Sequence, residues 1–167
     1  MSTAQTSAIH FDRSYDATVE DLWELWTTKS GFESWWGPEG FRVEVRALDL
    51  RVGGELHYAM IACGAEEIAY MQKSGMGTSH ETRGRFVEIE PLRRLQIRHI
   101  IDFIPGLEPY ENNMLVEFFE EGDRARMKIT IDAHRTEEWT QNAKAGMESQ
   151  LKKVPAALSL STGRLRD

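Results

Sequence analysis

Residues 11–28 have the sequence FDRSYDATVEDLWELWTT, in which a strand pattern changes into a helix pattern. Apolar and polar residues alternate over residues 8–16, as they do in a half-buried strand. Thr18, followed three positions later by Asp21, forms an acidic variant of the capping box that begins helices. The apolar residues that follow recur at helical spacing, and the Lys-Ser-Gly run at 29–31 is expected to end this helix.

Phe32, Trp35 and Trp36 predict a second short helical turn, which the Gly-Pro pair at 37–38 stops. Beyond it, the apolar residues change from a helical to a strand period. The strand pattern over residues 41–52 slips by one position, which indicates a β-bulge near residues 46–47. Further strand patterns cover residues 55–60, 81–90, 93–102, 113–120 and 126–134, of which the last two form a hairpin.

The last element begins at Thr136, a favourable N-cap that two glutamates follow. Apolar residues recur at spacings of three and four along residues 139–158, which predicts a long amphipathic helix. Pro155 is expected to kink or end its last turns. The order of strand, two short helices, six strands and long helix predicts an α+β fold. In this helix-grip arrangement, a curved antiparallel sheet of about seven strands wraps around the C-terminal helix.

Length and composition suit a single domain, because 167 residues with 41% apolar content can bury a substantial core. We expect this domain to cover residues 8–158, with flexible tails at 1–7 and 159–167. A net charge of -7 disfavours a nucleic-acid partner. No apolar run reaches the roughly 20 residues of a membrane span, and the first residues lack signal-peptide features, so a cytoplasmic location is expected. A lone cysteine, Cys63, forms no internal disulfide.

Several segments carry a resemblance to a known family. They are residues 11–28, the WWGPEGF run at 35–41, LDLRVGGEL at 48–56, RGRFVEIEPLRRL at 83–95 and the closing helix around 137–158. Their order and spacing resemble the activator of heat-shock-protein-90 ATPase homologue-like family of the SRPBCC (START-like) helix-grip superfamily. The resemblance implies a helix-grip fold that either holds a ligand or contacts a chaperone and stimulates its ATPase. It also admits an enzyme, since the superfamily includes cyclases and hydrolase-like members.

A space that tapers between a curved sheet and one helix is where a cavity for a small hydrophobic or amphipathic molecule is expected. His99 is in phase with the apolar residues of its strand, so it should face the interior, with Tyr58 as a second polar anchor. The alternative is a core histidine satisfied by its neighbours. The positions expected to line the cavity are Tyr58, Met60, Phe86, His99, Phe118, Met127, Met147 and Leu151.

The segment 63–80 interrupts the strand pattern where shorter family members have a tight hairpin. It places Ile68, Met71 and Met76 on a segment that is rich in glycine and serine towards its end. Apolar residues on such a segment suit a lid over the cavity. The alternative is a surface excursion, with two helical turns at 65–73, that packs on the edge of its own sheet.

Other patterns favour structural explanations. Trp35 and Trp36 could flank a ligand portal or form a protein-contact patch, but packing in the core under the sheet edge is favoured. Arg83, Arg85 and Arg98 are expected in cross-strand pairs on a solvated face rather than around an acidic ligand. No zinc-ligand spacing, nucleophile elbow, P-loop or dinucleotide fingerprint occurs, so neither a metal nor a cofactor is expected. An exposed sheet edge or the Trp-rich surface would allow a homodimer.

Overall fold

The computed structural model describes residues 8–75, 77–102 and 106–159. Its elements are β1 (Ile9–Tyr15), α1 (Val19–Thr27), α2 (Lys29–Trp35), β2 (Phe41–Leu48), β3 (Glu55–Ala62), α3 (Ala65–Lys73), β4 (Ser79–Glu90), β5 (Arg94–Ile101), β6 (Tyr110–Glu121), β7 (Arg124–Ile131) and α4 (Glu137–Leu151). The tail expected at 1–7, and all but the first residue of the tail expected at 159–167, lie outside the described residues.

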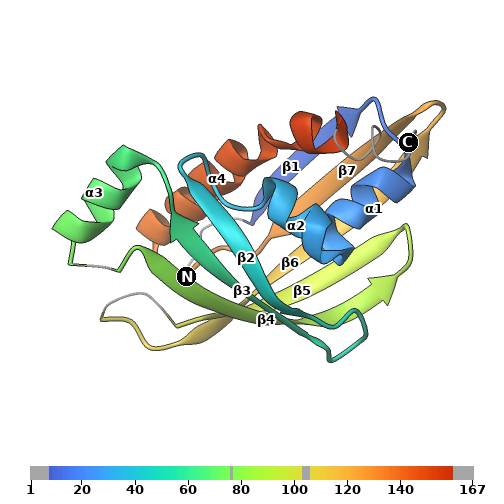
Figure 1. Cartoon of the computed structure of the whole chain (residues 1–167). Helices are drawn as coiled ribbons and strands as arrows, with labels where there is room; N and C mark the ends of the chain where they lie inside the picture. Colours follow the sequence, from blue (N-terminus) through green and yellow to red (C-terminus); the bar gives the residue numbers. More distant parts are fainter. Residues whose placement is uncertain (1–7, 76, 103–105, 160–167) are drawn as a thin grey trace.

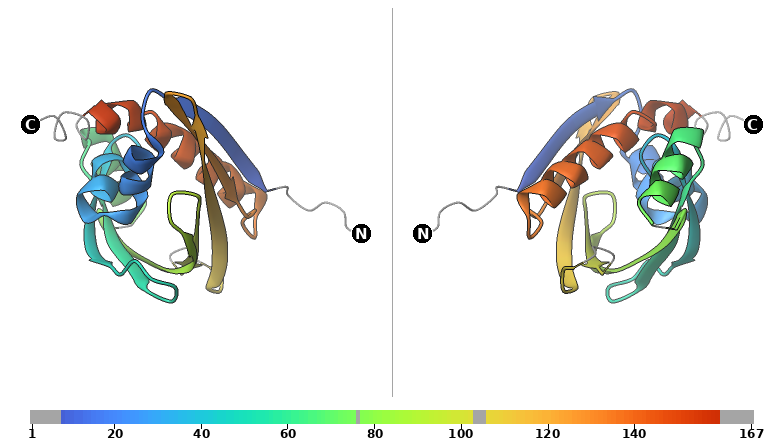
Figure 2. Two further views of the ribbon diagram at one scale, coloured as in Figure 1. Left: turned by 90° about the vertical axis from the view of Figure 1, so that its right-hand side faces the viewer. Right: turned by 90° about the vertical axis from the view of Figure 1, so that its left-hand side faces the viewer.

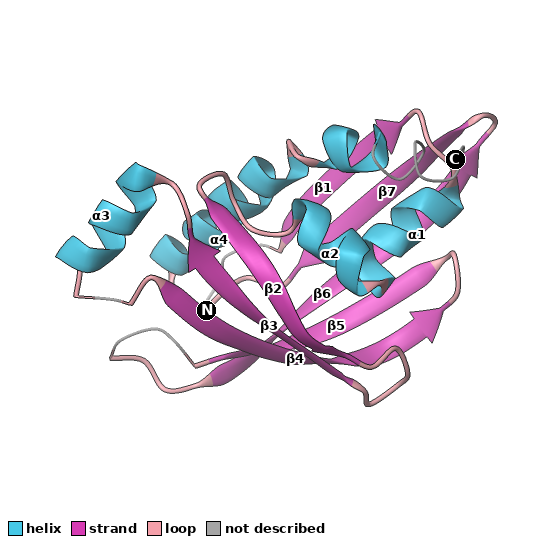
Figure 3. Ribbon diagram, viewed as in Figure 1, coloured by secondary structure: helices cyan, strands magenta, loops and turns pink. Residues whose placement is uncertain are grey.

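The strands form one seven-stranded sheet in the order β1-β7-β6-β5-β4-β3-β2, and every neighbouring pair is antiparallel. The sheet curls strongly, and α4 crosses its concave side (Figures 1 and 2). Helices α1 and α2 lie on the same side as α4, whereas α3 lies at one end of the sheet (Figure 3). The predicted α+β helix-grip architecture is therefore confirmed, and the sheet closes only partly into a barrel.

The start of α1 follows the prediction, and its end does not. The Thr18 hydroxyl accepts from the Asp21 amide at 3.0 Å, and the Asp21 carboxylate accepts from the Thr18 amide at 3.3 Å, which confirms the capping box. The expectation that residues 29–31 end this helix is wrong. Thr28 has an extended backbone, and its hydroxyl caps a new helix by accepting from the Gly31 amide at 3.0 Å. The run at 29–31 is therefore the first turn of α2.

The predicted bulge is present between Val45 and Ala47, but the strand that contains it is shorter than predicted. It ends at Leu48, and the apolar residues Leu50 and Val52 are 40% and 67% exposed in the following turn. The Gly54 amide donates to the Arg51 carbonyl at 2.8 Å and closes that turn. Apolar alternation alone could not show this end, because a turn is defined by its backbone hydrogen bonds.

The core is rich in aromatic residues from α1 and α2. Trp26, Phe32, Trp35 and Trp36 are all buried, with neighbouring ring centroids about 5 Å apart. The indole nitrogen of Trp35 donates to a backbone carbonyl of α1, and that of Trp26 points at the sulfur of Met127 on β7. The expectation that Trp35 and Trp36 pack in the core is confirmed, and the cluster fastens both helices to the concave face.

Helix α4 ends at Leu151, and after a turn at 152–153 the chain is helical again over 154–159. Pro155 has no N–H to donate to the carbonyl of Leu151, so the predicted interruption is confirmed. The amide oxygen of Gln150 accepts from the Gly37 amide at 2.8 Å, which joins α4 to the turn after α2. None of the described helices combines the length and apolarity needed to cross a bilayer.

Candidate functional site

The residues expected to line a cavity all lie on the inner side of the molecule. Strands β4, β5, β6 and β7 contribute one residue each, and β3 and α4 contribute two each. Seven of the eight are buried, and Met60 is half-buried. The eight residues are Tyr58, Met60, Phe86, His99, Phe118, Met127, Met147 and Leu151. All but His99 belong to, or pack against, a single hydrophobic cluster. Strand alternation placed these side chains on the correct face. Their role in binding stays a prediction.

Tyr58 and His99 meet although their strands are not neighbours. The Tyr58 hydroxyl lies 3.3 Å from Nε2 of His99, with β4 between β3 and β5. Gly84 of β4 is the cross-strand partner of His99, and a Cβ there would lie 2.9 Å from the carbonyl oxygen of Arg98. The missing side chain lets β4 and β5 approach closely at His99.

Trp36 covers this pair. Its ring is stacked on the His99 imidazole, with centroids 6.3 Å apart and planes inclined by 12°, and it meets the Tyr58 ring edge-on. The Trp36 side chain is near enough to the Tyr58 oxygen to favour its ionised form, yet its own Nε1 makes no hydrogen bond of acceptable geometry. The sequence favoured Trp36 as a core residue, with a ligand portal or a protein-contact patch as the alternatives. Nothing in its sequence context shows that its N–H lacks a partner.

Burial keeps both members of the Tyr58–His99 pair uncharged. It raises the pKa of the Tyr58 phenol, while the nearby Trp36 and Thr82 side chains act in the opposite direction to a smaller extent. Burial, and to a smaller extent the charge that His134 can carry, lowers the pKa of His99 to about 4. At neutral pH the phenol can therefore donate to Nε2, which leaves the imidazole proton on Nδ1.

His80 completes what we call the interior polar cluster, which consists of Trp36, Tyr58, His80, Thr82 and His99. It faces inward on β4, two residues before Thr82, and pairs with Met60 of β3. Its Nε2 is buried without a hydrogen-bond partner, like Nε1 of Trp36. Buried polar atoms almost always have a partner, and leaving one unsatisfied costs about 1–3 kcal/mol. Two such atoms, on residues that both belong to the inner side of the molecule, are open to a partner from outside the chain.

Charge is nearly absent from the interior. Within residues 8–75, 77–102 and 106–159, Asp21 is the only buried Asp, Glu, Lys or Arg, and its carboxylate caps α1. In the same ranges, no three His, Cys, Asp or Glu side chains are grouped in a way that could hold a metal ion. The interior polar cluster therefore offers neutral hydrogen-bonding groups.

A second inward polar group lies where β6 begins. The Tyr110 hydroxyl lies 2.5 Å from Nδ1 of His134, and Arg135 covers the Tyr110 ring at 4.9 Å. Asn112, the cross-strand partner of His99, donates to the Asp132 carbonyl at 2.9 Å. The predicted strand begins at residue 113, so the prediction did not include this group. The period-two pattern continues back to Tyr110 and could have revealed the group.

The described part of the predicted lid is helix α3. Met71 is buried, Ile68 is half-buried, and Met76 lies outside the described residues. The amides of residues 63 and 64 both donate to the Gly40 carbonyl, at 2.8 and 3.0 Å, so the helix is anchored at its start to the turn before β2. The packed surface excursion agrees with these contacts, and the role of a lid stays a prediction.

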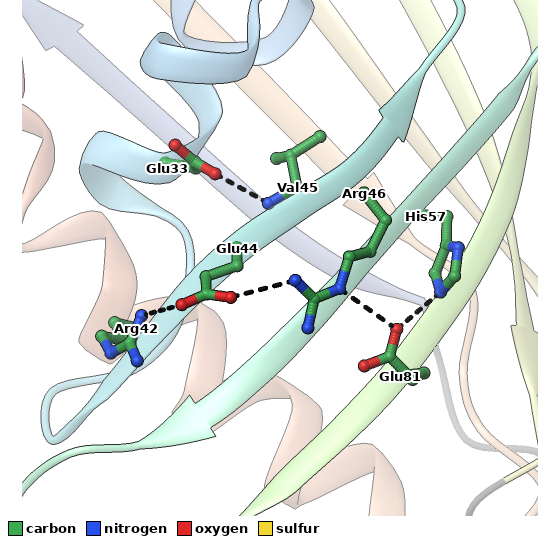
Figure 4. A network of polar contacts seen from close by, with 7 residues as sticks. All are labelled: Glu33, Arg42, Glu44, Val45, Arg46, His57 and Glu81. Carbon is green, nitrogen blue, oxygen red and sulfur yellow. Dashed lines mark hydrogen bonds and ion pairs between the residues drawn. The ribbon is translucent and has the colours of Figure 1, made fainter.

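The outer face of the sheet bears the charges. Glu44 receives hydrogen bonds from Arg42 at 2.6 Å and from Arg46 at 3.0 Å, and Glu81 pairs with Arg46 at 3.6 Å and with His57 at 2.7 Å (Figure 4). These contacts connect three neighbouring strands, β2, β3 and β4.

The expectation for Arg83, Arg85 and Arg98 is confirmed, since each reaches a polar side chain on a neighbouring or nearby strand of this outer face. Arg85 and Arg83 pair with glutamates at 3.1 and 3.8 Å, and Arg98 donates to Asn113 at 2.9 Å.

An open pocket of about 620 Å³ lies away from the interior polar cluster, between the start of α1, the β4–β5 turn and β6. Of the residues predicted to line the cavity, only Phe118 contributes to it. Leu92 at the turn has a φ of 66°, which is uncommon for a residue with a side chain. Most charged groups around this pocket are already paired, as when Arg94 binds both Glu88 and Glu117.

Comparisons with known proteins agree with this architecture. Residues 16–159 match the model of a family described as "Activator of Hsp90 ATPase homolog 1-like protein". A crystal structure of a protein from Chromobacterium violaceum is similar, with a TM-score of 0.76 and 22% identity over 91% of this chain and 96% of that chain. No curated protein matches the sequence significantly.

Two further solved structures have the same fold. A protein from Arthrobacter aurescens gives a TM-score of 0.73 at 23% identity, over 91% of this chain and 86% of that chain. The AHSA1 protein from Silicibacter pomeroyi gives 0.71 at 19% identity, over 93% and 99%. At such identities the likeness shows the fold alone.

Proposed function

The chain belongs to the Activator of Hsp90 ATPase homolog 1-like family, and we propose that it binds a small hydrophobic or amphipathic molecule between the concave face of its sheet and α4. The observation that carries this proposal is the pair of buried nitrogen atoms, Nε1 of Trp36 and Nε2 of His80, that have no hydrogen-bond partner. A ligand with one polar group would satisfy such atoms while its apolar part contacts the surrounding core.

The walls around the interior polar cluster suit an apolar molecule. Phe86 and Leu151 are buried on opposite sides, one on the sheet and the other on α4. Met147 belongs to the same hydrophobic cluster, and Met60 packs against it and is only partly buried. Methionine side chains are flexible and polarizable, so they can adapt to ligands of different shapes.

Binding accounts for the interior polar cluster better than acid–base catalysis does. A general base works best when its pKa is near the working pH. Burial lowers the pKa of His99 to about 4, so its imidazole is a weak base at neutral pH. Its contacts with Tyr58 and Trp36 fit a positioned, neutral hydrogen-bonding group.

The test is a native mass spectrum of the protein purified from its own source, recorded before and after extraction with organic solvent. We expect an additional discrete mass that disappears on extraction. The variant Phe119→Ser alters the open pocket, where Phe119 is 39% exposed, and should retain the additional mass. The variant Tyr58→Phe should retain less of it.

A bare protein mass in both spectra would contradict the proposal. It would favour the protein-contact alternative, which an Hsp90 ATPase assay with the added chain measures directly. Loss of the additional mass in Phe119→Ser, with retention in Tyr58→Phe, would instead place the ligand in the open pocket.

A further inference from the structure

We infer that the polar end of the bound molecule is an uncharged hydrogen-bond acceptor, such as a ketone or ester carbonyl, which the indole N–H of Trp36 binds beside Tyr58 and His99. This inference rests on the proposed function and specifies its ligand. Three observations support it: the chemistry of the unpartnered donor, the lack of charge around it, and the hydrogen bond that already joins Tyr58 to His99.

The unpartnered indole N–H of Trp36 determines which kind of ligand group can bind to it. An indole N–H can donate but cannot accept, so only an acceptor satisfies it. The side chain is 5% exposed, and its ring is held between His99 and Phe32, with centroid distances of 6.3 and 4.8 Å. The ring therefore cannot turn its N–H toward water without repacking the aromatic core.

The lack of charge excludes most ionised ligands. A carboxylate or phosphate end would need a buried Lys or Arg, and an ammonium end would need a buried carboxylate. Among the described residues Asp21 is the only such buried group, and it already caps α1. Burying an unpaired ion costs several kcal/mol, which exceeds the gain from one hydrogen bond.

The Tyr58–His99 pair sets the position of the acceptor. The phenol oxygen lies 3.3 Å from Nε2 of His99, to which the phenol can donate its proton. The Trp36 side chain is close to the same phenol oxygen, so an acceptor bound to Nε1 would lie beside it. Since both members of the pair are neutral at pH 7, they add no charge that would attract an ion.

The test compares three probes with ten carbons each, 2-decanone, decanoate and decylamine, by titration calorimetry at pH 8, where histidine side chains are ordinarily neutral. We expect 2-decanone to bind at least about tenfold more tightly than either ion, as one unmatched buried charge would require. In Trp36→Phe, which keeps an aromatic ring and removes the N–H, 2-decanone should lose about tenfold in affinity. The matched control is Trp139→Phe, because Trp139 packs against a separate cluster, formed by Ile101 and Tyr110, and should leave all three affinities unchanged.

The ranking of the probes by the unaltered protein decides the inference even if Trp36→Phe fails to fold. If decanoate or decylamine binds as tightly as 2-decanone, the neutral-acceptor inference is overturned and the proposed function stands. If no probe binds, the molecule extracted for native mass spectrometry decides: a neutral carbonyl compound supports the inference and an ionised one overturns it. If no probe binds and the native mass is also bare, both proposals are overturned.

Discussion

The two faces of the sheet differ in how their polar side chains are paired. On the outer face, charged side chains of β2, β3 and β4 pair with one another in a continuous network exposed to water (Figure 4). On the inner face, polar side chains are few and uncharged, and two of them leave a buried nitrogen without a partner. Water satisfies any group left unpaired outside, whereas an inner group depends on the protein or on a bound molecule.

The strand β2 lies at the edge of the sheet, and its edge is protected against pairing with a strand of another chain. The carboxylate of Glu33 on α2 accepts from the backbone amide of Val45 at 2.7 Å, next to the bulge (Figure 4). An edge strand with unpaired amides is a template for pairing with another chain. A bulge and a capped amide reduce that risk, so this edge is poorly suited to strand addition.

The largest expected difference between the faces is in core packing. Phe86 is fully buried on the inner face, whereas Val87, which lies in the register shift that follows it in β4, is only half-buried. We expect Phe86→Ala to lower the free energy of unfolding by about 3–5 kcal/mol through lost burial and a residual cavity. Val87→Ala should cost less than about 1.5 kcal/mol. Urea unfolding measures the loss in the free energy of unfolding for both variants. Equal losses would contradict the burial of Phe86 in the core.

The second prediction concerns pH. Because burial lowers the folded-state pKa of His99 from 6.5 to about 4, the unfolded chain takes up this proton first as the pH falls. The stability due to neutral His99 is complete above about pH 6.5 and is lost as the pH falls toward 4. Lowering the pH from 7.5 to 5 should cost about 2 kcal/mol through this group alone.

Comparison of His99→Gln with the outer-face variant His57→Gln isolates that effect. Urea unfolding at the two pH values should show a smaller acid-side loss for His99→Gln than for the unaltered protein. His57→Gln should keep the loss, because it leaves the buried imidazole in place. A His99→Gln protein with unchanged pH dependence would show that His99 is not held neutral by burial.

The third prediction tests the hydrogen bond inside the interior polar cluster. Tyr58→Phe removes the hydroxyl that lies 3.3 Å from Nε2 of His99, and leaves that nitrogen without its partner. We expect a loss of about 1–2 kcal/mol in the free energy of unfolding. Thermal and urea unfolding in ligand-free buffer measure it. A stability equal to that of the unaltered protein would mean that another group or water already satisfies His99.

The smallest effect is expected on the outer face. Glu111→Gln breaks the ion pair with Arg85, whose atoms are 3.1 Å apart and whose side chains are about half exposed. Exposed pairs contribute about 0–1 kcal/mol and weaken with salt. Urea unfolding at low and high ionic strength should therefore show a small difference that salt removes. A loss as large as that of Tyr58→Phe would overturn the contrast between the two faces.

The sequence by itself determined the order of the elements and the inner face on which the predicted lining residues of the strands lie. A residue's place in a strand period decides its face, so alternation put both Tyr58 and His99 on the inner side. Local backbone chemistry likewise revealed the capping box at Thr18, the bulge at residues 46–47 and the break at Pro155. These features depend only on residues close in sequence, where spacing and composition are sufficient.

Only the tertiary structure decided which inner residues meet. The Tyr58 hydroxyl lies 3.3 Å from Nε2 of His99, across the intervening strand β4 of the curled sheet (Figure 1). The unpartnered N–H of Trp36 and the inward position of His80 also appear only when helix and strands are packed together. Such contacts join residues far apart in the chain, and they depend on strand order and sheet curvature, which no local pattern encodes.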